Sequence, residues 1–272
     1  MPPPIKPPEG HVVKTPGLRD LFKARKGNWL VEADYRQLEL RIAALLANDE
    51  PLLKAFESGK DVHKLIAADL FGITYKEVTD KEREPEKTIV YGLNYGGGVD
   101  TIYSQIAPRF PYITKEMIRF LITRWYQFHP AIKVFQEKNL QNALDLGYVE
   151  EPLTGAIYPF FGDIKPTVVF NFPIQTAAAY IMKKAMKRVA ARLNWINEFL
   201  LMQIHDSLIL EGPSWQRLVR ILTQEMTKAV TFGDASMVFP VDIKVGTNWG
   251  ELIKLPKFIE GYKNGNYKAQ CN

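Results

Sequence analysis

Four side chains at a spacing of four could together bind a nucleotide. Arg83, Lys87, Tyr91 and Tyr95 recur within EREPEKTIVYGLNYGGG, residues 82–98. On a helix, this spacing places them along one slowly drifting face. Two cations at one end of that face suit a polyphosphate, and two rings further along suit a flat base. An ordinary amphipathic helix with a solvated basic turn has the same pattern, so the spacing alone leaves both interpretations open.

Two aspartates, Asp34 and Asp206, each interrupt an apolar segment. Residues 29–34 run into Asp34, and two apolar stretches within 199–212 flank His205 and Asp206, which predicts a buried hairpin. Adjacent carboxylates at strand ends are costly unless a cation neutralises them, and Mg²⁺ takes such oxygen ligands. Two ions about 3.5–4 Å apart would stabilise both the attacking and the leaving oxygen of a phosphoryl transfer. Taken singly, Asp206 is equally a turn residue and Asp34 equally a helix N-cap.

Composition allows a globular enzyme and excludes few classes. The chain has 272 residues, of which 46% are hydrophobic, and this content is enough for a sizeable core. Its formal net charge is +5. No run of 18 apolar residues indicates a membrane span. The start, MPPPIKPPEG, lacks the apolar stretch of a signal peptide, and the single cysteine, Cys271, fits a reducing cytosol. We therefore expect a cytoplasmic protein, in a bacterium or a virus-infected host cell.

Three segments in order resemble the motifs of family A DNA polymerases, the bacterial DNA polymerase I family. DYRQLELR (34–41) is similar to motif A, and QIHDS (203–207) is similar to motif C. Residues 83–96 keep the motif B spacing, Arg-x3-Lys-x3-Phe/Tyr-Gly-x2-Tyr-Gly. The resemblance covers roughly residues 14–255. It includes DVHKLIAADLFG (61–72), WYQFHP (125–130), NFPIQTAAA (171–179) and VDIKVGTNWGEL (241–252).

The resemblance implies an α+β fold, in which a small antiparallel palm sheet with flanking helices carries a mostly helical fingers insertion. The apolar segments independently predict a strand at 29–34, a hairpin near 198–212 and a late strand near 238–245. The expected segments are a proline-rich arm (1–13), a first part of the palm (14–48), fingers (49–170), a second part of the palm (171–255) and a basic, aromatic tail (256–272).

The implied activity is template-directed DNA synthesis, in which a dNTP is added to a primer 3′ end with the help of two Mg²⁺ ions. Asp34, Asp206 and the backbone carbonyl of Tyr35 would bind the metal ions. Lys87 would meet the phosphates near the transferred group as a catalytic residue, and Arg83 would bind the terminal phosphate. Such reactions are catalysed mainly by positioning and charge neutralisation.

Further substrate contacts follow from the same resemblance. His63 matches a histidine that touches the incoming triphosphate, although a solvent-exposed histidine near a helix start is the plainer interpretation. Tyr91 would stack on the nascent base pair, and Gln37 belongs to the substrate-binding set. Glu39 and Tyr95 match the pair that closes the space needed by a ribose 2′-hydroxyl, which favours DNA over RNA synthesis.

The DNA itself would contact polar side chains. Asn171, Gln175 and Gln203 match residues that reach the minor groove of the primer–template, where acceptor positions are shared by all base pairs. His205 would lie at the primer terminus, and Arg41 would support the site from behind. A separate set of cations recurs at i+4 spacing: Lys184, Arg188 and Arg192. These side chains suit contacts with backbone phosphates, or they form the solvated side of a helix that covers the core. The tail 256–272 could contact nucleic acid or a partner, or fray.

The sequence also departs from the family pattern. Ser207 stands where a glutamate usually follows His-Asp, and Glu84-Pro85-Glu86 replaces a more basic or neutral stretch. Because proline is tolerated best in the first turn of a helix, we expect the helix to begin near Arg83.

Motif A lies so early in the chain that no family thumb or exonuclease precedes it. We therefore expect a catalytic subunit, as in a split viral polymerase, whose separate partner chain supplies the thumb, with or without an exonuclease. A compact polymerase of low processivity and a non-catalytic, DNA-binding replisome scaffold are the alternatives.

Overall fold

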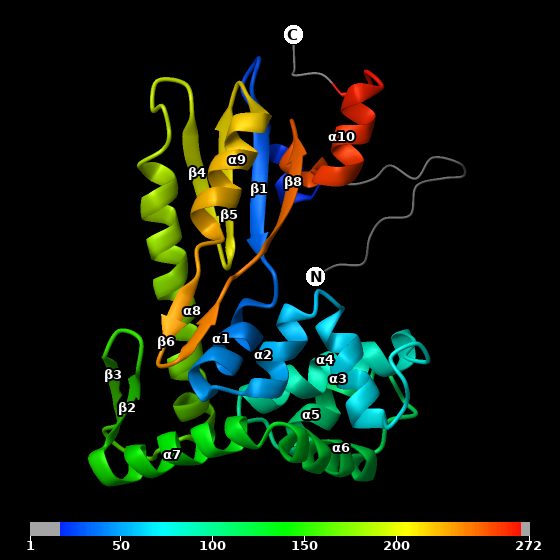
Figure 1. Cartoon of the computed structure of the whole chain (residues 1–272), viewed down its shortest axis with the longest axis vertical. Helices are drawn as coiled ribbons and strands as arrows, with labels where there is room; N and C mark the ends of the chain where they lie inside the picture. Colours follow the sequence, from blue (N-terminus) through cyan, green and yellow to red (C-terminus); the bar gives the residue numbers. More distant parts are fainter. Residues whose placement is uncertain (1–16, 268–272) are drawn as a thin grey trace, which may run out of the picture. The chain divides into compact units, whose positions relative to one another are not determined.

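The computed structural model describes residues 17–267, which form two compact units (Figure 1). We call the first the sheet unit; its described part comprises residues 17–34, 189–225 and 241–267. The second, the helical unit, comprises residues 35–188 and 226–240. These divisions differ from the segments expected from the sequence, and both units are assembled from stretches that are distant in the chain. The proline-rich arm and Cys271 lie outside the described residues.

The sheet unit is built on a five-stranded sheet in the order β4-β5-β1-β8-β9 (Figure 1). Strands β1 and β5 pair antiparallel, with Trp29 opposite Gly212 and Asp34 opposite Ser207. Every residue of β5 is buried, as expected for an apolar strand in the interior of a sheet. The strands are β1 (Trp29–Tyr35), β4 (Phe199–Ile204), β5 (Ser207–Gly212), β8 (Val241–Gly246) and β9 (Ile253–Lys254); helices α9 (Trp215–Met226) and α10 (Leu255–Lys263) and the 3₁₀ turns Leu18–Leu21 and Trp249–Glu251 accompany them.

The C-terminal tail contributes to the core of the sheet unit. Phe258 of α10 is 1% exposed, and its ring contacts the rings of Trp29 and Trp215 edge to face at 5.4 and 5.2 Å. Tyr262 and Tyr267 pack against the same phenylalanine. The expectation that this segment frays is therefore wrong for residues 255–267, because its aromatic side chains cover the sheet. A contact of this segment with nucleic acid or a partner stays a prediction.

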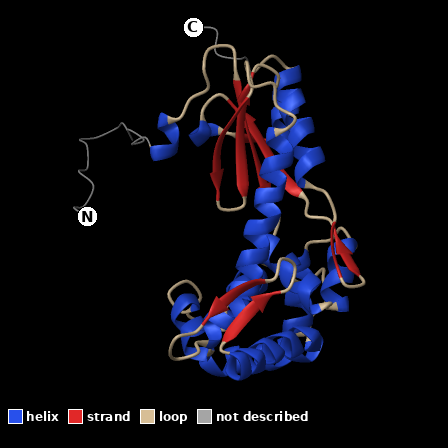
Figure 2. Cartoon of the chain, turned by 90° about the vertical axis from the view of Figure 1, so that its left-hand side faces the viewer, coloured by secondary structure: helices blue, strands red, loops and turns tan. Residues whose placement is uncertain are grey.

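The helical unit is largely α-helical, apart from two short hairpins (Figure 2). No helix among residues 17–267 is long and apolar enough to cross a membrane. The α+β fold expected from the sequence is confirmed. The elements are α1 (Leu38–Ala47), α2 (Glu50–Glu57), α3 (Val62–Phe71), α4 (Asp80–Asn94), α5 (Val99–Ile106), α6 (Lys115–Phe128), α7 (Pro130–Leu146), β2 (Tyr148–Glu151), β3 (Ala156–Pro159), α8 (Pro166–Ala190, whose last two residues belong to the sheet unit), β6 (Val230–Phe232) and β7 (Ala235–Met237).

Helix α4 begins earlier than expected. Thr79 caps it in a reciprocal capping box with Glu82, so the first helical residue is Asp80 and Pro85 lies in the second turn. Proline cannot donate to the carbonyl four residues before it. That carbonyl, on Lys81, instead accepts a hydrogen bond of 2.8 Å from the Tyr112 hydroxyl. The predicted start near Arg83 was wrong because a side chain from outside the helix satisfies the acceptor that Pro85 leaves open.

Glycines allow α4 to pack closely against its neighbours. A Cβ on Gly92 would lie 2.8 Å from the Cγ1 atom of Ile102 in α5. Just after the helix, Gly96 has a φ of +69° and would bring a Cβ within 2.8 Å of the Phe170 ring. Both positions therefore require glycine, the second on conformational grounds as well. This packing fixes the end of α4 on which Tyr91 and Tyr95 lie.

Candidate active site

Two carboxylates meet at one edge of the sheet unit. Asp34 ends the part of β1 that pairs with β5, directly opposite Ser207. Asp206 precedes Ser207 in the two-residue turn that joins β4 to β5. Asp34 is therefore not the N-cap of α1, a position that Gln37 occupies. The sheet register brings Asp34 and Asp206 to the same edge although 172 positions separate them in the sequence (206 − 34).

The turn that carries Asp206 has an unusual backbone. His205 has a φ of +51°, a left-handed conformation that is uncommon for a residue with a side chain. The Gln203 side-chain amide donates to the His205 carbonyl at 2.6 Å, and the Ser207 hydroxyl donates to the Ile204 carbonyl at 3.0 Å. Ser207 thus closes the turn as a hydrogen-bond donor and adds no negative charge beside Asp206. Backbone strain of this kind is typical of functional sites.

Burial and like charges make Asp34 a poor acid. The pKa of Asp34 is raised from 3.8 to about 6, first by burial and then by the charge of Asp206, with Glu32 and Asp242 adding to the effect. Lys244 acts in the opposite direction. A cation at this edge would offset the repulsion and lower the pKa of Asp34.

A neighbouring ion pair was not anticipated from the sequence. Glu32, two residues before Asp34 on β1, is buried, and its carboxylate accepts from the Lys244 ammonium at 2.6 Å and from the Trp249 indole at 2.8 Å. Strand alternation places residues 32 and 34 on one face of β1, so the sequence already indicated that Glu32 lies near Asp34. The positive partner from β8 could be assigned only once the strand order was known.

The donors at this edge suit Mg²⁺ better than a transition metal. Among residues 17–267 no group of three or more histidine, cysteine or carboxylate side chains converges as a complete ligand set. Mg²⁺ is commonly held by one or two carboxylates, with water and substrate phosphates completing its shell. Asp34 and Asp206 offer two such carboxylates. Tyr35 is anchored in the helical unit, where its hydroxyl donates to the Met226 carbonyl at 2.8 Å.

The predicted stripe exists in the helical unit. Arg83, Lys87 and Tyr91 lie on α4, and Tyr95 is its C-cap. All four side chains are half-buried, whereas the opposite face of the helix, which includes Ile89, is fully buried. The stripe is therefore the partly exposed face of a helix that packs into the core by its other side, and its cations remain accessible.

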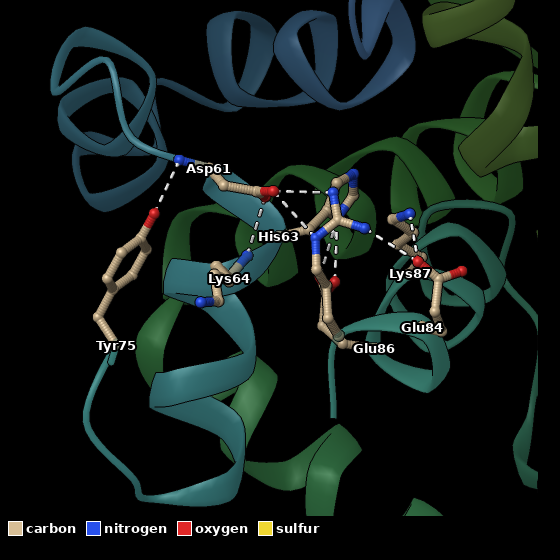
Figure 3. Close-up of polar contacts among 8 residues, drawn as sticks. Asp61, His63, Lys64, Tyr75, Glu84, Glu86 and Lys87 are labelled. Atoms are coloured by element: carbon tan, nitrogen blue, oxygen red, sulfur yellow. Dashed lines mark hydrogen bonds and ion pairs between the residues drawn. The ribbon is translucent and has the colours of Figure 1, made fainter. Parts of the chain in front are cut away.

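Both cations of the stripe are engaged by carboxylates (Figure 3). Arg83 contacts the Oδ2 atom of Asp61 at 2.8 Å and the Oε1 atom of Glu84 at 2.9 Å. Lys87 contacts the same Glu84 oxygen at 2.7 Å. The hydrogen bond from Lys87 is the main cause that holds the pKa of Glu84 below its ordinary value. Asp61 also caps α3, because it accepts from the Lys64 backbone at 3.1 Å.

His63 is buried, contrary to the exposed alternative. Its Nδ1 atom lies 3.0 Å from Oε2 of Glu86, and both side chains are at most 4% exposed. Burial is the main cause that raises the pKa of Glu86 from 4.5 to about 7. The ring of His63 lies 5.9 Å from that of Tyr91. The structure thus places His63 beside Tyr91, and the glutamate that holds His63 is one of the two that depart from the family pattern.

Glu39 and Tyr95, the last residue of the stripe, are in contact. The Tyr95 hydroxyl donates a hydrogen bond to the Glu39 carboxylate, although 56 positions separate them. Gln37 adopts a left-handed conformation before α1. Arg41 is held by the carbonyls of Arg36 and Val238 at 3.1 and 3.3 Å, so it fixes the backbone around motif A within the helical unit.

The residues expected to meet DNA are distributed over both units. Gln203 and His205 are exposed in the sheet unit. Gln175 is exposed on α8, and Asn171, one turn earlier, is half-buried. No hydrogen-bond partner within residues 17–267 reaches the buried Oδ1 atom of Asn171.

The row of cations on α8 is divided. Arg192 lies beyond the helix and contacts Glu225 at 3.6 Å in the sheet unit. In the helical unit, Lys184 and Arg188 line a cavity of about 380 Å³, to which Lys228 also contributes. No acidic residue lines this cavity, so we call it the basic cavity.

Most of the chain is similar to known DNA polymerases. A family model described as DNA polymerase family A matches residues 4–251. The thermostable DNA polymerase I of Thermus thermophilus is 33% identical over 245 residues, which cover 86% of this chain and 28% of that protein. DNA polymerase I of Bacillus caldotenax is 34% identical over 261 residues, covering 90% and 28%. The chain thus spans less than a third of the length of these relatives.

A solved structure shares the fold. The POL domain of Pol1 from M. smegmatis, in complex with DNA primer-template and dNTP, matches with a TM-score of 0.74 and 26% sequence identity. The match covers 85% of this chain and 42% of that one.

Proposed function

Because the chain belongs to DNA polymerase family A, we propose that it catalyses the template-directed addition of dNTPs to a primer 3′ end. The observation that carries the proposal is the carboxylate edge, where Asp34 and Asp206 meet across β1 and the β4–β5 turn. Their mutual repulsion and partial burial support the proposal, because a divalent cation at this edge would relieve both.

Asp34, Asp206 and the Tyr35 carbonyl would hold two Mg²⁺ ions. When bound, the ions would stabilise the attacking 3′ oxygen and the leaving oxygen of the phosphoryl transfer. Gln203 and His205, exposed at the same turn, would contact the primer terminus and the adjoining minor groove. Ser207 would maintain the turn that positions Asp206.

In the helical unit, Arg83 and Lys87 would bind the triphosphate, with His63 held nearby by Glu86. Lys87 would neutralise charge that develops near the transferred phosphate. Tyr91 would stack on the nascent base pair. Glu39, fixed by Tyr95, would exclude a 2′-hydroxyl, and Gln37 would complete the nucleotide contacts. Asn171 and Gln175 would face the minor groove of the duplex.

The proposal is tested by primer extension with Asp206→Ala. This change removes one of two metal-binding carboxylates, so we expect nucleotide addition in Mg²⁺ to fall at least a thousandfold while the thermal midpoint is preserved or raised. Asp163→Ala is the matched control, because Asp163 is an exposed aspartate outside the motifs. Extension by Asp206→Ala at near wild-type rates would show that the two-metal assignment is wrong.

Three expectations from the sequence stay predictions: a separate partner chain that supplies the thumb with or without an exonuclease, the division into palm and fingers, and a cytoplasmic location. The alternative of a non-catalytic DNA-binding scaffold predicts DNA binding without extension by the wild-type chain, in any metal. The same assay distinguishes the two functions.

A further inference from the structure

Glu84 occupies the two cations on which triphosphate binding is proposed to depend. One oxygen of its carboxylate, Oε1, lies 2.9 Å from an Arg83 nitrogen and 2.7 Å from the Lys87 ammonium (Figure 3). Its side chain is 33% exposed, and those of Arg83 and Lys87 are 23% and 29% exposed. The three groups therefore form a bridged cluster within reach of solvent and of a dissolved ligand.

We propose that Glu84 is an internal counter-anion that an incoming triphosphate must displace from Arg83 and Lys87. The inference rests on the proposed function and extends it, because Glu84 would set the affinity of the site and its selectivity for highly charged anions. Glu84 is a positioning residue in this scheme, since it acts through the two cations and does not touch the reacting atoms.

The geometry makes Glu84 displaceable. Ion pairs between partly exposed side chains stabilise a protein only weakly, so a ligand of higher charge can replace them. Glu84 follows Arg83 directly and lies three residues before Lys87 on the same helix, so a change of its rotamer frees both cations without moving the backbone. In contrast, the buried Glu86 is fixed by His63 and cannot act in this way.

Asp61, the second carboxylate on Arg83, differs from Glu84 in function. Its side chain also caps α3 and its backbone N–H contacts the Tyr75 hydroxyl, so it is part of the framework that orients Arg83. Asp61 remains in place when Glu84 moves. Arg83 would therefore stay directed while Lys87 is released, and a ligand needs to compete with only one carboxylate to reach both cations.

The single charge of Glu84 predicts selectivity by ligand charge. A monophosphate gains little by replacing a carboxylate that already contacts two cations, whereas a triphosphate brings several charges and can contact both at once. Removing the Glu84 charge should therefore strengthen the binding of all phosphate ligands and reduce the preference for triphosphate over monophosphate.

Binding of inorganic tripolyphosphate to the full chain tests this without requiring catalysis. We expect Glu84→Gln to bind tripolyphosphate about three- to tenfold more tightly than wild type in calorimetry, and phosphate by a larger factor. Glu116→Gln is the matched control, because Glu116 forms an exposed pair with Arg119 at the same i,i+3 spacing on α6. The control removes the same charge and should leave both affinities unchanged.

A second variant tests whether Glu84 acts through the cations. In a Lys87→Met background, Glu84→Gln should improve tripolyphosphate binding by less than half the factor seen with Lys87 present. In primer extension, Glu84→Gln should lower the KM for dNTP by a similar factor with little change in kcat.

Equal or weaker tripolyphosphate binding by Glu84→Gln would overturn the inference, because Glu84 would then only stiffen the cluster. An equal gain with and without Lys87 would also overturn it. If wild type extends primers while Glu84→Gln is unchanged, this inference alone fails. If wild type neither binds tripolyphosphate nor extends primers, the proposed function fails and the inference with it.

Discussion

At the scale of single residues, the contact between Glu39 and Tyr95 lies at the end of the α4 stripe to which we assign nucleotide binding. The Tyr95 hydroxyl donates to the Glu39 carboxylate, so each side chain restrains the orientation of the other. We expect Glu39→Ala to open the space near the 2′ position and to increase ribonucleotide incorporation about tenfold or more relative to deoxyribonucleotide. Competition between the two nucleotides in single-addition assays measures this ratio, and an unchanged ratio would assign Glu39 and Tyr95 a structural role only.

A second residue-scale prediction concerns the buried pair His63 and Glu86. Burial raises the Glu86 pKa to about 7 despite the opposing effects of His63, Arg83 and Lys87. The folded state therefore retains a proton that the unfolded chain releases near pH 4.5, so this group makes the free energy of unfolding fall as the pH rises from about 4.5 to 7. The loss is on the order of 3 kcal/mol.

Glu86→Gln removes this titration while keeping a hydrogen-bond partner for His63. Its free energy of unfolding should therefore decline less than that of wild type across the same pH window. Urea denaturation at pH 5, 6, 7 and 8 measures the difference between the two proteins. Parallel pH profiles would contradict the raised pKa of Glu86.

At the scale of elements, α8 presents cations to a cavity that contains no acid. Lys184 and Lys228 are exposed at the basic cavity, and Lys183 and Lys187 are exposed elsewhere on α8. If the basic cavity receives backbone phosphates, Lys184→Ala with Lys228→Ala should weaken duplex binding several-fold and reduce the slope of log affinity against log salt by about 1 to 2.

The matched control for this prediction is Lys183→Ala with Lys187→Ala, which removes the same charge from the same region. Fluorescence anisotropy of labelled primer–template at several salt concentrations compares the two double variants. Equal effects would mean that net charge, and not the basic cavity, governs the interaction with DNA.

At the scale of the whole molecule, the chain corresponds to 42% of the POL domain that binds primer-template in the matched structure. A chain of 272 residues offers less surface to duplex phosphates than the longer chain of that complex. We therefore expect the chain alone to add only a few nucleotides per encounter at physiological salt, and a duplex-covering partner to lengthen the products. Extension in the presence of a heparin trap measures this, and long products from the chain alone would contradict the need for a partner.

The sequence by itself determined the features that depend on local spacing. The spacing of four residues on α4 determines which side chains share its exposed face. The apolar segments interrupted by Asp34 and Asp206 predict where both strands end. Both patterns follow from helix and strand geometry alone. The order of the motifs was recognised from the resemblance to family A polymerases, which also implied the α+β class.

The tertiary structure alone decided which distant groups meet. The Tyr112 hydroxyl reaches Lys81 from 31 positions away and permits Pro85 inside α4, and Lys244 reaches Glu32 from 212 positions away. Burial is a property of the assembled core, so it alone could show that Glu86 is enclosed with His63 while Glu84 stays accessible. Two glutamates that flank one proline look equivalent in sequence, and their different surroundings give one a buried hydrogen bond and the other a contact with two cations.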